Sequence, residues 1–402
     1  MTTALDIAAQ GFEVHLVERA DRLGGQALNF RHKENGVDTL EFVQDMVKKV
    51  ESNNLIKVHL NAKVKDIPGF VGNFNLQLED GTDEPVGAVI FAVGAPAYKP
   101  TEYNYGSDAK VMTGLECEQA IADGKFNAKN VAFIQCVGSR NDSVGYCSRV
   151  CCTTALRNAI QIKLADPTAN VTIFHKDIRT YGFREEMYRK ASEVGVRFLR
   201  YDEEAPLPAY DGNTVTAFDL TLGADVSVPV DCVVLSNGIA PAREEKEELA
   251  KMVKVPISKD GFYFEAHQKL RPVDFATEGV YVAGLAHWPK HMDECIAQGS
   301  GAASRSLTII SKKFLTSEGI VASVNEDYCD GCGVCEGCCE YKAITIVSKD
   351  GALKSNVNAG LCKGCGCCVA ACPSGAMEQK GFKNIQIQAE IDACLDYPVG
   401  GE

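Results

Sequence analysis

The chain has 402 residues, which is enough for two or three domains. Its 46% hydrophobic and 24% charged residues are typical of a globular protein, and its net charge of −13 argues against nucleic acid as a partner. No apolar run is as long as a membrane span and no basic cluster opens the chain, so we expect neither a transmembrane segment nor a signal peptide.

The beginning of the chain fits a dinucleotide-binding unit that is entered halfway. Apolar residues within 4–9 follow one face of a helix, Gly11 stands where this helix should end, and residues 12–17 read as a strand that leads to Glu18. In a Rossmann unit such an acidic residue binds the adenosine ribose, about 20 residues after the first glycine of Gly-x-Gly-x-x-Gly. Counting back that far ends before residue 1, so we expect this loop and the strand before it to be missing.

Three segments resemble the flavoproteins with two dinucleotide-binding domains, the thioredoxin reductase group among them. They are Glu18-Arg19 with the Leu-Gly-Gly-Gln run at 23–26, the strand and turn at 89–95, and the strand and glycine at 279–284. The resemblance implies FAD, with Leu285 standing where the family usually has aspartate, and a helix over 291–310 whose N-terminus faces the isoalloxazine ring. The implied contacts to FAD are Glu18, Arg19, Gly24, Gly25, Gln26, Ala92, Gly94, Gly284 and Leu285.

A second α/β unit has lost its nucleotide loop. Residues 130–134 read as its first strand, and the run at 135–140 that follows lacks most glycines of a pyrophosphate-binding turn. Four cysteines come instead, which is the number of thiolates that a [4Fe–4S] cluster needs. They are Cys136, Cys147, Cys151 and Cys152. Their spacing is irregular, and buried free thiols or a redox-active dithiol are the alternatives.

Two cysteine runs near the C-terminus have the spacing of a bacterial ferredoxin with two [4Fe–4S] clusters. Three cysteines of one run and the last of the other hold each cluster in such a module. This crossed pattern predicts one set of Cys329, Cys332, Cys335 and Cys372, and a second set of Cys362, Cys365, Cys368 and Cys339. Zinc knuckles or a disulfide scaffold are the alternatives. Eighteen cysteines without a secretion signal indicate metal clusters in a reducing compartment, so we expect a cytoplasmic protein.

The combination of these segments resembles the HdrA family, the flavin and iron–sulfur subunits of heterodisulfide reductases, over essentially the whole chain. The cysteine-containing runs at 135–140 and 147–152 carry the resemblance, together with the runs at 175–182, 284–290 and 298–303. It implies FAD, three [4Fe–4S] clusters and a flavin that bifurcates electrons between a high-potential acceptor and ferredoxin. The partners implied are the B and C subunits, a hydrogenase or formate dehydrogenase module, soluble ferredoxin, and a polypeptide that supplies the missing N-terminal part.

Other functions remain open on the sequence alone. A related electron-input subunit of a benzoyl-CoA reductase or of a quinone-linked sulfate-reduction complex is one, and a non-bifurcating NAD(P)H-dependent flavoprotein reductase is another. A scaffold that only carries clusters is a third. Lys290, His287 and Arg179 are candidates for tuning the flavin, with ordinary surface or satisfied polar roles as the alternative.

The expected fold is α/β, a thioredoxin-reductase-like pair of dinucleotide-binding domains followed by an α+β ferredoxin domain with two [4Fe–4S] clusters. We expect the FAD domain at 1–112 and 274–316, the second domain at 113–273, the ferredoxin domain at 317–381 and a docking tail at 382–402. A charged helix at 243–254 should be solvated within the second domain, and a helix at 385–395 should pack on the chain.

Overall fold

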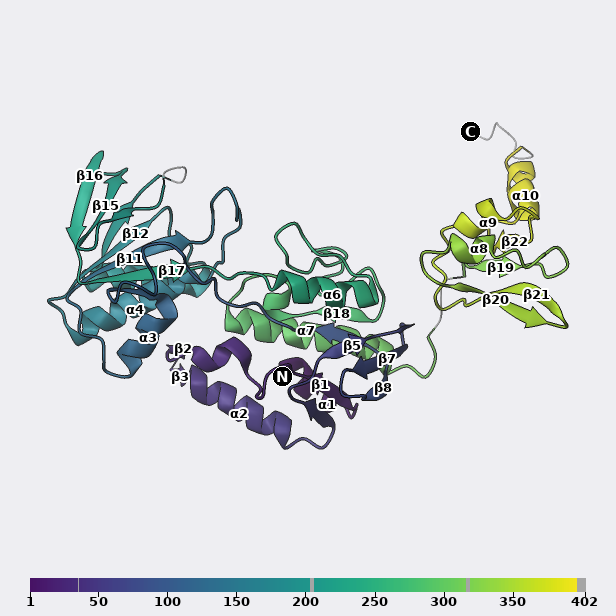
Figure 1. Cartoon of the computed structure of the whole chain (residues 1–402), viewed down its shortest axis with the longest axis horizontal. Helices are drawn as coiled ribbons and strands as arrows, with labels where there is room; N and C mark the ends of the chain where they lie inside the picture. The colour runs from purple at the N-terminus through teal and green to yellow at the C-terminus, as the bar shows by residue number, and fades with distance from the viewer. Residues whose placement is uncertain (35, 203–205, 316–318, 396–402) are drawn as a thin grey trace, which may run out of the picture. The chain divides into compact units, whose positions relative to one another are not determined.

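The computed structural model divides into two compact units and describes residues 1–34, 36–202, 206–315 and 319–395. One unit comprises Met1–Gly69 with Asn73–Ile310, and the other comprises Phe70–Gly72 with Ser311–Glu402 (Figure 1). Among the described helices, none is both long and apolar enough to cross a membrane.

The first half of the first unit, before Ala97 and after Ile239, is called the flavin half after the resemblance described above. It contains two parallel strand pairs with helices beside them. Strand β1 (Val14–Val17) pairs with β4 (Ile56–His59), and β9 (Val89–Phe91) pairs with β18 (Val280–Val282). The other elements here are α1 (Thr2–Ala8), η1 (Gly25–Asn29), β2 (Lys33–Glu34), β3 (Val37–Asp38), α2 (Thr39–Glu51), β5 (Val64–Asp66), β6 (Gly69–Phe70), β7 (Asn73–Leu78), β8 (Asp83–Val86), α6 (Arg243–Val253), η3 (Gly284–Ala286) and α7 (Met292–Ile310). Helix α1 lies along α7, where the Thr3 hydroxyl donates to the Gly299 carbonyl at 3.0 Å.

Helix α6 forms where a charged helix was expected, but its surroundings differ from the prediction. Ala250 and Val253 pack into a core with Phe91 and Val280, and the Lys246 side chain is fully buried. The helix is therefore half-buried on the strands of the flavin half and is not solvated within the second domain. The buried face of this helix could not be predicted from the sequence. It consists of one lysine and two small apolar residues within a run of glutamates and lysines, which gives only a weak amphipathic pattern.

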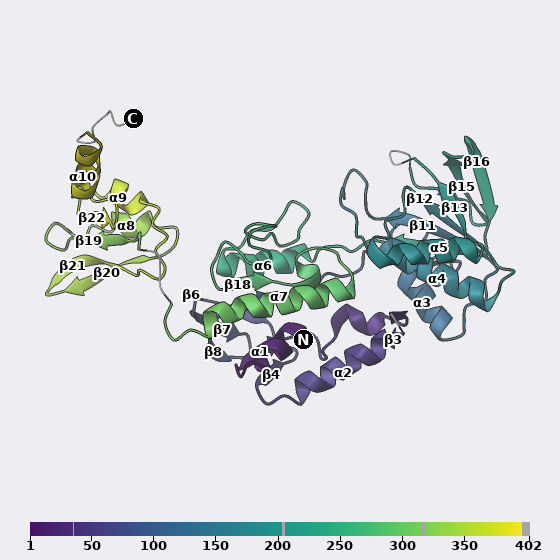
Figure 2. The same cartoon turned by 180° about the vertical axis from the view of Figure 1, so that it is seen from behind.

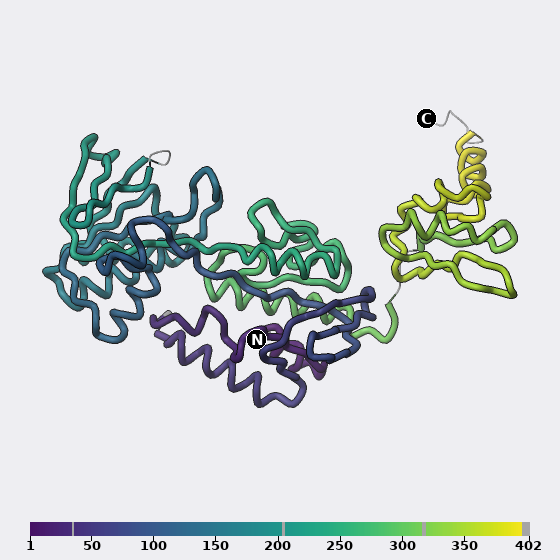
Figure 3. The backbone as a smooth tube through the Cα atoms, in the orientation of Figure 1, coloured from purple at the N-terminus to yellow at the C-terminus, as the bar shows by residue number. Residues whose placement is uncertain are grey.

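The chain passes to the second α/β half and back through two adjacent segments. Ala97 bridges Ile239 in antiparallel fashion, and the Tyr98 N–H donates to the Gly238 carbonyl at 2.7 Å. Figure 3 shows the outgoing and returning segments side by side.

The second half is a five-stranded parallel sheet in the order β10-β17-β11-β12-β13. Its elements are β10 (Val111–Thr113), α3 (Gly114–Ala122), β11 (Asn130–Val137), α4 (Cys151–Ala165), β12 (Asn170–His175), η2 (Gly182–Arg184), α5 (Glu185–Glu193), β13 (Arg197–Arg200) and β17 (Cys232–Asn237), with an antiparallel sheet of β14 (Ala209–Tyr210), β15 (Thr214–Asp219) and β16 (Ala224–Pro229). Val131 and Phe133 on β11 face the core under α3, α4 and α5, whereas Ala132 and Ile134 face the core under β15 and β16. Figure 2 shows the three helices together against the sheet. This alternation is the sign of a sheet covered on both faces.

The second unit is built from two similar halves, each with two strands, a cysteine run and a short helix. The outer strands β19 (Ala322–Val324) and β22 (Met377–Gln379) pair antiparallel, as do the inner strands β20 (Ile344–Lys349) and β21 (Ala352–Val357). The short helices are α8 (Val334–Gly337) and α9 (Cys367–Ala371). Corresponding residues lie 33 positions apart, as Cys329 and Cys362 illustrate.

Helix α10 (Asn384–Leu395) forms as expected after the ferredoxin-like part, but none of its residues is buried. The prediction that it packs on the chain is therefore wrong for the described residues, since Ile385 and Leu395 are more than three-quarters exposed. The rest of the predicted docking tail, 396–402, lies outside the described residues.

Candidate flavin and iron–sulfur sites

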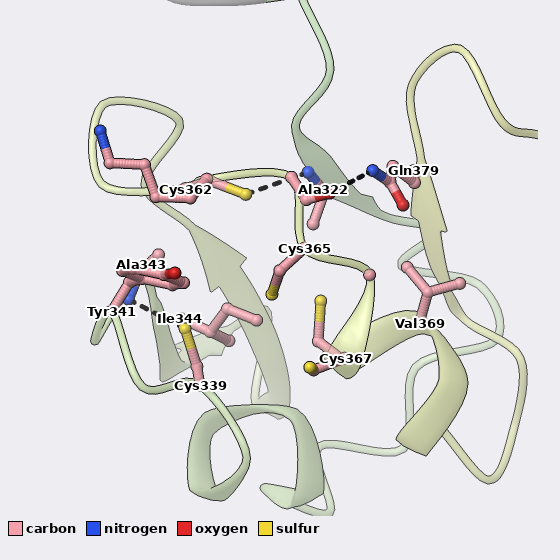
Figure 4. A pocket seen from close by; sticks show the side chains of 14 residues that line it. Ala322, Cys339, Tyr341, Ala343, Ile344, Cys362, Cys365, Cys367, Val369 and Gln379 are labelled. Atoms are coloured by element: carbon pink, nitrogen blue, oxygen red, sulfur yellow. Dashed lines mark hydrogen bonds between the residues drawn. The ribbon is translucent and has the colours of Figure 1, made fainter. Parts of the chain in front are cut away.

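Cysteines of both runs line one cavity in the second unit. Its lining includes the four cysteines of the second predicted set, with Cys367 beside them. They are Cys339, Cys362, Cys365 and Cys368. Figure 4 shows the sulfur atoms of Cys339, Cys362 and Cys365 around this space. The Ala343 N–H donates to Cys339 Sγ and the Ala322 N–H to Cys362 Sγ, each at 3.3 Å. Crossed ligation requires Cys339 to lie with three cysteines of the other run, as it does in this cavity.

The first set has a different polar environment. Cys329 and Cys335 are buried, and the Ser355 Oγ lies 3.0 Å from Cys335 Sγ. Burial alone would raise the pKa of the Cys329 thiol, but hydrogen bonds from the N–H groups of Ser355 and Gly331 and from the Ser355 hydroxyl lower this pKa overall. Cys372, the fourth member, has a similarly lowered pKa because hydrogen bonds from residues 374–377 outweigh its burial. Thiolates are the form that binds iron, so this environment favours ligation.

Glycines make the tight cysteine loops possible. A Cβ atom at Gly331 would lie 2.3 Å from the Leu353 carbonyl oxygen, and one at Gly364 would lie 2.4 Å from that of Ile320. Both glycines also have positive φ angles, of 68° and 61°. A side chain is excluded at both positions by space and by backbone conformation.

The four cysteines of the second half gather where β11 ends and α4 begins. Cys136 stands in β11 with a φ of 64°, Cys147 lies in the following loop, and Cys151 and Cys152 open α4. Burial raises the pKa of Cys151 well above its ordinary value, and the neighbouring Cys152, Cys136 and Cys147 raise it further. Mutual charge effects of this kind require the four sulfurs to be near one another, and a bound metal would stabilise the thiolates that burial disfavours.

No described group of three or more metal-ligating side chains is assembled as it would be around a bound ion. The fit of the clusters therefore rests on the cysteine cavity, on the N–H groups aimed at sulfur and on the shared environment of the buried thiols.

The turn after β11 is closed to a dinucleotide. A Cβ atom at Gly138 would lie 2.2 Å from the Tyr98 ring, so this aromatic side chain lies over the glycine. Pyrophosphate binding at a Rossmann turn needs the backbone to be approachable at this place. The sequence predicted that this turn has lost its nucleotide loop. In the structure, the Tyr98 ring also covers the turn.

The first flavin signature lies at the end of β1. The Glu18 carboxylate accepts from the Ala20 N–H at 2.9 Å, and Gly24 and Gly25 both have positive φ. Arg19 forms an ion pair with Glu245 on α6, while Gln26 is exposed and accepts from Asn29. No atom would meet a Cβ at Gly25, so the backbone there is open to a ligand.

Both parallel strand pairs of the flavin half have an open edge. The Val14 N–H of β1 donates to the Leu55 carbonyl, just before β4, so in this parallel pair the main chain of His15 and Val17 faces away from β4. Strand β18 is flanked on its far side by the segment at 273–275, which leaves the other edge of β9 open within the described part of the chain. Ala92 is exposed and Gly94 has a φ of 71° at the end of β9.

Two of the three candidate tuning residues, Lys290 and His287, lie together beside the third flavin signature. Lys290 Nζ donates to the Gly284 carbonyl at 2.7 Å and lies 3.4 Å from His287 Nδ1. Burial lowers the pKa of Lys290 to about 8. Leu285 follows Gly284 in η3, and the Gly284 N–H donates to the Gln298 side chain at 2.9 Å.

The third candidate, Arg179, donates from its Nε to Asp177 at 2.9 Å. Asp177 also pairs with Arg140, whose Nη1 is 3.9 Å from Cys136 Sγ. Arg179 is therefore paired beside the cysteines of the second half, whereas Lys290 and His287 contact each other.

One connection between the cysteine loop and α7 was not predicted. Arg149 Nη2 donates to the Glu294 carboxylate at 2.7 Å and to the Tyr181 hydroxyl at 2.8 Å. Glu294 also accepts the His291 N–H at 2.8 Å, where α7 begins. Both Arg149 and Tyr181 lie in runs that carried the family resemblance, but no sequence signal pairs them with Glu294.

Comparisons with known proteins agree with this arrangement. A scan against protein-family models finds no match. The chain is 34% identical to the A-type iron–sulfur subunit of the CoB–CoM heterodisulfide reductase of Methanocaldococcus jannaschii, over 98% of this chain and 75% of the relative. It is 44% identical to the A-type subunit of the H2:CoB–CoM heterodisulfide,ferredoxin reductase of Methanothermobacter marburgensis, over 78% of this chain but only half of the relative.

Solved structures establish the fold of the first unit. The thioredoxin reductase of T. acidophilum superposes with a TM-score of 0.51 at 17% identity, over 77% of this chain and 93% of that enzyme. That of Lactococcus lactis gives 0.52 at 18% identity, over 77% and 95%. The predicted thioredoxin-reductase-like α/β fold is confirmed. The chain belongs to the HdrA family of heterodisulfide reductase iron–sulfur subunits and is part of an oxidoreductase.

Proposed function

We propose that the chain carries FAD and three [4Fe–4S] clusters and transfers electrons within a heterodisulfide-reductase-type complex. One observation supports this most directly: cysteines of both runs line one cavity in a chain whose other unit has a flavoprotein fold. The relatives are named as subunits of reductases that act on the CoB–CoM heterodisulfide, some together with ferredoxin.

The proposed cluster ligands form three sets. They are Cys329, Cys332, Cys335 and Cys372; Cys339, Cys362, Cys365 and Cys368; and Cys136, Cys147, Cys151 and Cys152. FAD would lie against Glu18, Arg19, Gly24, Gly25, Gln26, Ala92, Gly94, Gly284 and Leu285. Bound FAD exchanges electron pairs and single electrons, whereas each cluster exchanges single electrons. The chain's own residues would hold these groups, exclude water and set their potentials.

We propose that the FAD site is completed by a strand that enters the open edges of β1 and β9, followed by a glycine-rich turn. The main chain of His15 and Val17, which faces away from β4, and the open turn at Gly25 support this. An added strand would pair in parallel and satisfy these groups. FAD titration tests it: the chain alone should bind FAD weakly, and co-expression with a strand–Gly-x-Gly-x-x-Gly segment should increase the affinity. Equal affinities would contradict it.

We also propose that the flavin bifurcates electrons, delivering one to a high-potential, disulfide-reducing B/C-type partner and one to soluble ferredoxin. The donor would be a hydrogenase or formate dehydrogenase type module, and the compartment the cytoplasm. Lys290 supports a tuned flavin because a buried ammonium with a pKa near 8, bonded to the Gly284 carbonyl, can change charge near neutral pH. NAD(P)H is disfavoured as the donor by Tyr98 over Gly138.

Iron analysis of matched variants tests the ligand sets. The reconstituted chain should hold about twelve irons. Cys339→Ser should lose about four irons, and the neighbouring Cys367→Ser should keep them all, because only Cys339 is assigned as a ligand. Cys151→Ser and the buried Cys117→Ser form the same comparison for the second half. Equal losses in ligand and control variants would overturn the assignments.

A further inference from the structure

The two halves of the ferredoxin-like unit differ at one buried position beside the cysteine sulfurs. The Ser355 N–H donates to Cys329 Sγ at 3.4 Å, and the Ala322 N–H donates to Cys362 Sγ at 3.3 Å. Both the strand residues and the cysteines are 33 positions apart. Ser355 and Ala322 therefore occupy equivalent places, with the same main-chain bond and different side chains.

The Ser355 hydroxyl adds a second contact that Ala322 cannot make. Its Oγ lies 3.0 Å from Cys335 Sγ and 3.6 Å from Cys329 Sγ, and Ser355 is only 2% exposed. An iron-bound thiolate carries no proton, so the hydroxyl must then be the donor. Over the described residues, no hydroxyl is bonded to a cysteine of the second set. Its cavity is lined by the aliphatic side chains of Ala322, Ala343, Ile344 and Val369 and by the polar side chains of Tyr341, Lys363 and Gln379.

A hydrogen bond to a ligating sulfur stabilises the more negative, reduced state of a cluster and so raises its reduction potential. The effect is strong here because the donor is buried and water does not compete with it. Two kinds of charge act in the opposite direction: acidic residues near the first run, and Lys363 beside Cys362 of the second set. Glu326, Asp330, Glu336 and Lys363 are all exposed and screened by solvent. The buried hydroxyl should therefore dominate.

We propose that Ser355 is a redox-tuning residue that raises the potential of the Cys329/Cys332/Cys335/Cys372 cluster above that of its neighbour. This inference depends on the ligand sets proposed above. The step is the uptake of one electron, with no bond formed or broken. An electron that enters the unit would rest on the cluster beside Ser355, which gives the pair of clusters a direction.

A reciprocal substitution tests the proposal on the full chain, reconstituted with iron and sulfide and titrated with dithionite under EPR detection. Ser355→Ala should lower the reduction potential of one cluster. At a fixed solution potential its reduced-to-oxidised ratio should fall about tenfold, which corresponds to about 59 mV for one electron. Ala322→Ser should raise the potential of the other cluster by a similar amount. Ser355→Thr keeps the hydroxyl and should leave both potentials in place.

The outcomes separate this inference from the proposed function. Unchanged potentials in both Ser355→Ala and Ala322→Ser, at full iron content, would overturn the role of Ser355 and leave the ligand sets intact. A shift of the same cluster by both substitutions would overturn it as well. Should Ser355→Ala lose iron, Ala322→Ser still decides, because it adds a donor without removing one. Fewer than about eight irons in the wild-type chain would instead contradict the ferredoxin ligand sets themselves.

Discussion

Replacement of Lys246 by methionine should stabilise the flavin half, and by an amount that depends on pH. Lys246 is fully buried on α6, and its Nζ has no hydrogen-bond partner and lies 4.5 Å from the centre of the Phe262 ring. Burial, and secondarily the charge of Lys290, lowers the pKa of Lys246 from 10.5 to about 8. One pKa unit corresponds to about 1.4 kcal/mol, so a charged Lys246 costs the fold at most about 3 kcal/mol at pH 7. Methionine has a similar volume and no charge, and a gain of about 1–3 kcal/mol follows.

The pH dependence gives the sharper result. Because the folded-state pKa is below the unfolded one, the unfolded chain binds more protons between pH 8 and 10.5, and wild-type stability rises with pH across this window. The advantage of the methionine variant should be full below pH 8 and fall to about half by pH 9.5.

Urea unfolding followed by tryptophan fluorescence measures this locally. Trp288 is the only tryptophan of the chain, and its ring centre lies 5.1 Å from that of Phe262. Lys251→Met on the exposed side of α6 is the control and should change the urea midpoint little at either pH. A Lys246→Met gain that is absent at pH 7, or equal at pH 7 and 9.5, would refute the reasoning.

Three further predictions follow from buried or crowded groups. Gly364→Ala should lose about four irons because its Cβ would meet the Ile320 carbonyl, whereas Gly351→Ala, which has open space around it, should keep them. Arg149→Met should speed amide hydrogen exchange in the loop at 147–152, since it removes the bonds to Glu294 and Tyr181; unchanged exchange would contradict a tethering role. Asp274→Asn should cost about 1–3 kcal/mol in urea unfolding, because a buried carboxylate that accepts from Arg305 and Arg271 loses its charge; a neutral result would contradict this.

Local pattern was sufficient for many elements of the fold. The alternation of apolar residues and the turn glycines predicted β1, β9, β11, β18 and α7 within a few residues of their observed bounds. Such patterns are read correctly because each strand or helix buries a face whose period is written in neighbouring residues. The two cysteine runs were also recognisable from the sequence, since four cysteines within eleven residues have the spacing of a ferredoxin loop.

Contacts between segments far apart in the chain could not be predicted from local sequence patterns. Nothing in the helix at 243–253 indicates that it packs on β9 and β18, because that depends on a neighbour more than 150 residues earlier in the chain. The link from Arg149 to Glu294 and the ring of Tyr98 over Gly138 are of the same kind. Each contact joins segments far apart in the chain, and no periodic pattern or fixed spacing in the sequence predicts such a pair.

The sequence by itself determined the class of chemistry, because the number and spacing of cysteines limit the metal centres that a chain can hold. It also determined the order of the two dinucleotide-binding halves and the ferredoxin-like unit. Only the tertiary structure decided what surrounds each sulfur: a hydroxyl at Ser355, a methyl group at Ala322 and a cavity at Cys339. The spacing of the cysteines identifies the candidate ligands. Tertiary packing decides which hydrogen-bond donors and charges lie beside them, and these set the reduction potentials of bound clusters.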